Sequence, residues 1–214
     1  MKTEDLMNML ATGAGAVDAR LPARRIGMAI GVGLLGAGVL MAGTLGVRAD
    51  IAHAISQEGM FWVKFAFVAL SAAGSVVLVS RLCQPGARFS GLPAMLAAPV
   101  LAIWTLAAFA LIEAGPGNRA PLLLGESWAV CPFGIALLSL PVLVAVMWAM
   151  KGLAPTRLRL AGAAAGLLAG TLGAVVYTLH CPEVAAPFLG TWYVLGMLIP
   201  TAVGALLGPR VLRW

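Results

Sequence analysis

The sequence predicts an all-α, polytopic membrane protein: a six-transmembrane-helix bundle with short loops and a cytoplasmic N-terminal tail. The 214-residue chain is 61% hydrophobic and only 10% charged, whereas soluble domains average about 45–50% apolar and about 25% charged residues. Six segments are also apolar for long enough to cross a hydrocarbon core of about 30 Å, which needs roughly 20 residues of helix. This composition excludes a soluble globule, a disordered chain, a coiled coil and a nucleic-acid-binding domain.

The six predicted spans are joined by connections too short to hold a folded extramembrane domain. Lys64 is the charged residue that lies deepest in them, and we expect it to snorkel to the membrane interface or to meet Glu58. The chain therefore divides into a tail of residues 1–25 and a transmembrane domain of residues 26–214. In chain order the spans cover residues 26–47, 61–80, 92–112, 132–150, 158–179 and 188–207.

Basic residues fall unequally on the two sides of the predicted bundle. Eleven Lys and Arg residues lie in the tail and in the connections on the same side, and three lie on the other side. Cytoplasmic loops of membrane proteins are enriched in Lys and Arg. We therefore expect both termini to be cytoplasmic.

The span 158–179 carries a small residue at every fourth position. Gly162, Gly166, Gly170 and Ala174 fall on one face of a helix, and small residues let membrane helices approach closely. We expect this face to contact another helix of the same bundle. A seam between two copies of the chain is the alternative.

Two of the three cysteines are predicted to reach the same outer face. Cys131 precedes the fourth span and Cys181 follows the fifth, and these spans form a hairpin around a basic turn. The two arms, of 20 and 24 residues, rise about 30–36 Å from that turn, so the sulfurs lie at matching heights. Cys83 falls on the cytoplasmic side and is expected to be inert.

The surroundings of the two outer cysteines leave their chemistry open. Each is followed by proline, and a helix N-terminus at Cys131 favours a thiolate. His180 stands beside Cys181 as a further ligand for a soft metal, so Cys131, His180 and Cys181 are the candidate metal ligands. A structural disulfide, a pair that senses redox or soft-metal stress, and chance placement all fit the pattern. No cofactor is expected.

Residues able to carry catalysis or ion transport are scarce. The chain holds two histidines and no acidic residue in a predicted membrane core, although ion-coupled transporters usually place ionisable groups there. We therefore expect no enzymatic activity. The alternative functions are a membrane thiol oxidoreductase, a metal or small-solute transporter, and a purely structural membrane subunit. An oxidoreductase would need a second reactive pair of cysteines or a quinone site.

The N-terminal tail is the one predicted cytoplasmic segment large enough to hold a protein partner. Thr3 fits an N-cap, and Asp5 in the first turn suits the helix dipole. Leu6, Met9 and Leu10 then form an apolar stripe at i, i+3, i+4 spacing. So short a helix is unstable alone in water, and we expect it to fold as the stripe enters a groove of the partner. A frayed tail leading into the membrane is the alternative.

Several stretches of the chain resemble those of one family, and the resemblance covers nearly its whole length. In these stretches the chain is similar to the NrsF-like membrane proteins, which are negative regulators of the sigma factor called sigma F. The stretches are Met1-Lys2-Thr3-Glu4-Asp5-Leu6, Arg48-Ala49-Asp50-Ile51, the Cys131 flank, the Ala154-Pro155 turn and, most specifically, Tyr177-Thr178-Leu179-His180-Cys181 with Pro187-Phe188 and Trp192-Tyr193.

The resemblance implies a six-span anti-sigma factor, located as a multi-pass protein in the bacterial inner membrane. Its tail, including Asp5, Leu6, Met9 and Leu10, would hold an extracytoplasmic-function sigma factor inactive. Its outer cysteines, here Cys131 and Cys181, would be needed for the response to metal or oxidative stress. The sigma factor and the lipid bilayer are then the expected partners, without direct contact to nucleic acid, and a homodimer is left open.

Overall fold

The structure is a computed structural model, and it describes residues 3–5, 7, 21–84 and 91–213. Over these residues every regular element is helical, and six helices are long and apolar enough to cross a membrane. The all-α, six-span prediction is therefore confirmed. The spans are α2 (Leu21–Thr44), α4 (Gly59–Leu82), α5 (Leu92–Glu113), α7 (Cys131–Lys151), α8 (Leu158–Tyr177) and a composite last span, Ala186–Val211.

The predicted span boundaries agree with the structure least well at α2, which begins at Leu21 and ends at Thr44. The helix stops because Gly46 adopts a left-handed conformation, with φ +74°, and its N–H donates to the Met41 carbonyl at 2.8 Å. This is a common way of closing a helix, and glycine adopts the conformation without strain. The chain then turns into α3 (Ile51–Gln57).

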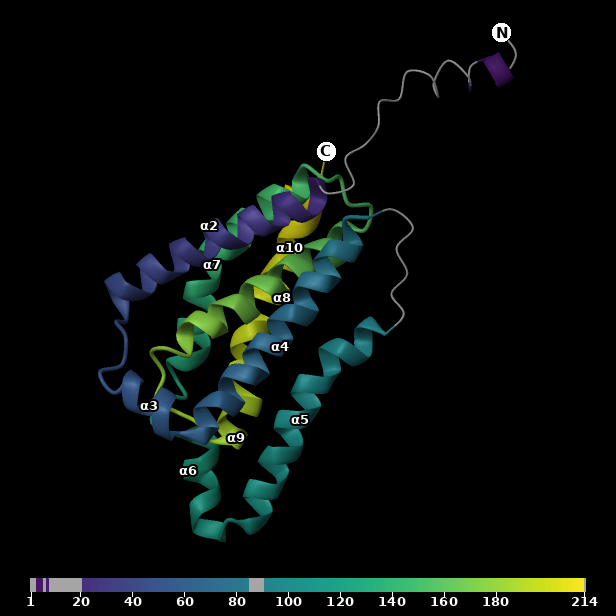
Figure 1. The fold of residues 1–214 in the computed structure, drawn as a ribbon. Helices are drawn as coiled ribbons and strands as arrows, with labels where there is room; N and C mark the ends of the chain where they lie inside the picture. Colours follow the sequence, from purple (N-terminus) through teal and green to yellow (C-terminus); the bar gives the residue numbers. More distant parts are fainter. Residues whose placement is uncertain (1–2, 6, 8–20, 85–90, 214) are drawn as a thin grey trace.

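Short helices gather at one end of the bundle (Figure 1). They are α3, α6 (Arg119–Leu124), which follows the 3₁₀ turn Pro116–Asn118, and α9 (Ala186–Phe188). After α9 the last span continues through a π-helical turn, Leu189–Tyr193, into α10 (Val194–Val211). Such π turns inside helices often accompany functional sites, and this one carries Tyr193 into the protein interior.

Helix α8 is the central helix of the bundle (Figure 1). It packs against α10, α7 and α4. Its most apolar stretch is 78% buried, against 11% for α5, which lies at the edge of the bundle. A disturbance of α8 therefore reaches most of the other spans.

The small-residue face of α8 lies directly against α10. A Cβ atom added to Gly162 would lie 2.1 Å from the Gly204 carbonyl oxygen, and one added to Gly166 would lie 2.1 Å from the Pro200 carbonyl oxygen. At Gly170 the corresponding distance to the Met197 carbonyl oxygen is 2.7 Å. Because these neighbours are backbone atoms, only glycine fits. The expected close contact within the bundle is confirmed, and its partner is α10.

Candidate functional site

Cys131 and Cys181 meet in the structure. Cys131 is the first residue of α7, with Pro132 in the first helical turn, and Cys181 lies in the segment 178–185 that links α8 to α9. Both are free thiols with exposed fractions of 0% and 1%, and their side chains interact with each other. The equal heights predicted from the hairpin thus correspond to neighbouring side chains.

Lys64 is a member of this site that the sequence analysis missed. Its side chain is fully buried, and Nζ donates to the carbonyl oxygens of Cys181 at 2.7 Å and Glu183 at 3.0 Å. Nζ also lies 5.2 Å from the centre of the Tyr193 ring, in a cation–π contact. The prediction that Lys64 snorkels or meets Glu58 is wrong, because the segment 178–185 supplies the acceptors that water would otherwise offer. The sequence carried one signal for this role. Lys64 is an ionisable residue inside an apolar span, and ionisable residues in that position are commonly functional.

A second cation, Arg48, reaches the site from the connection between α2 and α3. Its guanidinium pairs with Asp50, with Nε 2.6 Å from Oδ1, and lies 3.6 Å from a Glu58 carboxylate oxygen. The hydrogen bond with Asp50 raises the pKa of Arg48, and the same bond holds the pKa of Asp50 at about 2. The charge of Arg48 also interacts with Cys181, so a permanently charged guanidinium lies near this cysteine.

These surroundings favour a thiolate at Cys181. The interaction with the Cys131 side chain lowers the pKa of Cys181, and the Lys64 ammonium lowers it further against the effect of burial. The sequence had pointed to the helix N-terminus at Cys131 as the stabiliser of a thiolate. The structure instead places Lys64 and the charge of Arg48 next to Cys181, which favours the thiolate at this cysteine.

Aromatic rings and a loop surround the site. The Tyr193 hydroxyl is buried, makes no hydrogen bond of normal geometry to a described residue, and interacts with Cys181. The Tyr177 ring lies 6.0 Å from that of Tyr193, and Ser127 Oγ is 3.9 Å from the Cys181 sulfur. A reagent must therefore be small, or the connection around Ser127 must move, before the thiols can react.

The three-ligand metal set suggested by the sequence is not assembled. Within the described part of the chain, no three His, Cys, Asp or Glu side chains are placed to hold a metal ion. His180 donates from Nδ1 to the Gly46 carbonyl at 3.0 Å, and its ring lies 5.5 Å from that of Tyr177. It thus ties the end of α2 to the segment 178–185, and Cys131 and Cys181 are left as a pair of sulfur ligands.

Of the remaining predicted residues, the structure describes Cys83 and Asp5. Cys83 is buried at the end of α4, and burial raises its pKa to about 11, which agrees with an unreactive thiol. Asp5 is exposed. The other three residues assigned to partner binding, Leu6, Met9 and Leu10, lie outside the described residues.

The fold and the site define a six-span membrane protein with a buried, cation-flanked cysteine pair at one end. The chain matches the family model described as "NrsF: Negative regulator of sigma F" over residues 10–214, and it belongs to this family. It is 58% identical to the "Probable anti-sigma-F factor NrsF" of Azospira oryzae and 38% identical to the "Anti-sigma-F factor NrsF" of Caulobacter vibrioides, each over the full length of both chains. No solved structure matches it.

Proposed function

We propose that this chain is an anti-sigma factor of the bacterial inner membrane. Its cytoplasmic tail binds an extracytoplasmic-function sigma factor and releases it when the pair Cys131/Cys181 reacts at the outer face. The names of its relatives support the regulatory role. The observation that carries the sensing step is the interaction of two buried thiols from separate spans beside Lys64.

The proposed orientation places both termini in the cytoplasm. It rests on the eleven basic residues expected on that side, against three on the other. Two of those three, Arg48 and Lys64, are engaged at the cysteine site, and Arg119 alone of the three is exposed.

The reaction that we propose at the pair is an oxidation of two thiols to a disulfide. The Cys181 thiolate attacks hydrogen peroxide to give a sulfenic acid and hydroxide, and the Cys131 thiol displaces the sulfenic oxygen. Two thiols and one peroxide thus yield one disulfide and two waters. A thiophilic cation would instead bind both sulfurs with release of their protons. Either event changes the interaction between the two side chains and the charge beside Lys64.

A chain of contacts leads from this site to the end of α2, the helix that the tail precedes in the sequence. Lys64 holds the segment 178–185, and that segment holds the end of α2 through the bond from Arg48 N–H to the Leu179 carbonyl at 3.1 Å and through the bond between His180 and Gly46. Helix α2 continues into the tail. The glycine face of α8 is turned to α10, so we propose that the signal passes through α2 rather than along that face.

The tail prediction is tested by a double substitution in the apolar stripe. Leu6→Asp with Leu10→Asp is expected to weaken binding of the sigma factor by more than about tenfold, because buried anchors commonly carry 2 kcal/mol or more each. Transcription that depends on the sigma factor should then rise without any inducer. The matched control, Asn8→Asp with Ala11→Asp, adds the same charge on the opposite helical face and should still repress. Full repression by the stripe variant at normal abundance would contradict docking through this face.

The cysteine pair is expected to act as one unit. Cys131→Ser and Cys181→Ser should each abolish the transcriptional response to hydrogen peroxide, and the double variant should be no worse, because residues sharing one element are not additive. Cys83→Ser should respond normally, since its thiol is separate from the pair. Thiol trapping in untreated and treated cells reads out the disulfide directly. A pair that is fully bonded before treatment, together with responsive single variants, would refute the sensing role.

A further inference from the structure

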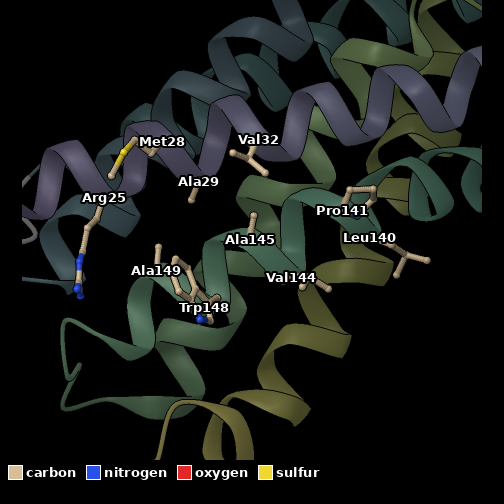
Figure 2. A pocket seen from close by; sticks show the side chains of 10 residues that line it. All are labelled: Arg25, Met28, Ala29, Val32, Leu140, Pro141, Val144, Ala145, Trp148 and Ala149. Atoms are coloured by element: carbon tan, nitrogen blue, oxygen red, sulfur yellow. The ribbon is translucent and has the colours of Figure 1, made fainter.

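A groove of about 930 Å³ lies between α2 and α7 (Figure 2), and its lining contains no residue of the cysteine site. Apart from Arg25 and the indole N–H of Trp148, the side chains that line it are apolar. Figure 2 shows Ala29 and Val32 of α2 directed toward α7, while Ala145 and Ala149 of α7 point back toward α2. The small alanine side chains on both walls leave this space open, and its volume falls within the range of about 300–1,000 Å³ that is typical of small-molecule sites.

The groove is closed at one end by the crossing of the two helices. A Cβ atom on Gly33 would lie 2.7 Å from Cα of Val142, and one on Gly36 would lie 2.9 Å from Cβ of Pro141. Both contacts fall near the middle of helices that are 24 and 21 residues long. The tight crossing therefore lies near the centre of the bilayer.

The length of the groove matches one leaflet of a membrane. Its α7 wall runs from Leu140 to Ala149, which is about 14 Å of helix at 1.5 Å per residue. Half of a hydrocarbon core of about 30 Å is of similar depth. A molecule that fills the groove would extend from the bilayer centre to one interface, as an acyl chain of a single leaflet does.

The open end of the groove carries positive charge. Arg25 stands there and donates to the Gly152 carbonyl at 3.0 Å, and Arg24 and Lys151 are exposed nearby in the sequence. Among the described residues no carboxylate pairs with Arg25. A guanidinium is suited to phosphate because its N–H groups match the spacing of phosphate oxygens. Trp148, which is 79% exposed in the absence of lipid, fits the aromatic belt of the interface.

We propose that this groove binds one glycerophospholipid with an anionic headgroup from the cytoplasmic leaflet. An acyl chain lies between Val32 and Val144, and the phosphate is bound by Arg25. The leaflet assignment rests on the orientation proposed above. Because α2 leads into the tail, a lipid in this position would hold the tail-proximal half of α2 against α7.

The test is native mass spectrometry of the full chain with two lipids of identical acyl chains, dioleoyl phosphatidylglycerol and dioleoyl phosphatidylcholine. The wild-type protein should retain one phosphatidylglycerol molecule in preference to phosphatidylcholine. Ala145→Phe fills the groove and should lose retention of both lipids, whereas Ala108→Phe, on the exposed surface of α5, should not. Retention by Ala145→Phe that equals the wild type would overturn the groove as the binding site.

Three further variants test the headgroup assignment. Arg25→Gln should bind phosphatidylglycerol about fivefold more weakly, as expected for one basic residue at an anionic membrane surface. Arg25→Lys and Arg210→Gln should keep the preference. An unchanged preference of Arg25→Gln for phosphatidylglycerol would contradict phosphate binding by Arg25. A dimer that Ala145→Phe abolishes would show instead that a second copy of the chain occupies the groove. A periplasmic reporter that is active after residue 214 would move the lipid to the other leaflet, independently of these binding results.

Discussion

Replacing Gly166 with leucine is expected to prevent the six helices from assembling. A Cβ at this position would lie 2.1 Å from the Pro200 carbonyl oxygen and 2.7 Å from Cα of Thr201. Both atoms belong to the backbone of α10, so α8 and α10 would have to separate. Overpacking with flexible neighbours already costs about 1–3 kcal/mol, and a backbone clash on the central helix should cost more.

The measurement is thermal unfolding of the purified protein in detergent. The quantity recorded is the fraction of protein that stays monodisperse after heating. A matched control is Gly38→Leu in α2, because a Cβ atom on Gly38 meets no atom within 4 Å. This control should melt within a few degrees of the wild type. Equal melting of the Gly166 and Gly38 variants would show that α8 and α10 do not make the contact described.

Replacing Lys64 with methionine is expected to slow the reaction of Cys181 at neutral pH. The ammonium helps to lower the pKa of the Cys181 thiol from an ordinary value of 9.0, so the wild-type thiol is more ionised at neutral pH than an ordinary thiol. Without Lys64 the pKa rises, and below both pKa values the rate falls about tenfold for each unit of pKa. Above both values the two proteins should react at similar rates.

This prediction is checked with a small reagent, methyl methanethiosulfonate, by following modification of Cys181 by peptide mass between pH 5 and 10. A Cys83→Ser background removes the third thiol, and Lys151→Met is the control for loss of a lysine elsewhere. Lys64→Met should also melt at lower temperature, because the carbonyls of Cys181 and Glu183 lose their donor at about 1–3 kcal/mol each. Rates are therefore normalised to folded protein. Superimposable pH profiles of Lys64→Met and the wild type would exclude the role assigned to the ammonium.

The sequence by itself determined the six spans, because a spanning helix satisfies its own backbone hydrogen bonds and needs only its own apolar length. It also determined that Cys131 and Cys181 reach one height, since helical rise fixes the position of each along the hairpin. The glycines at 162, 166 and 170 likewise predicted a close helix contact from spacing alone. All three conclusions depend on the length, rise and periodicity of single helices.

Only the tertiary structure decided which faces meet. In a membrane protein the core and the lipid are equally apolar, so hydropathy does not separate the inner face of a helix from its outer face. The partner of the glycine face, α10, was therefore not predictable. Lys64 was misplaced for a related reason: its acceptor at Cys181 is 117 residues away in the chain, and only the folded segment 178–185 brings that carbonyl within reach. A buried charge is stable only where such acceptors exist, and their placement is a property of the whole fold.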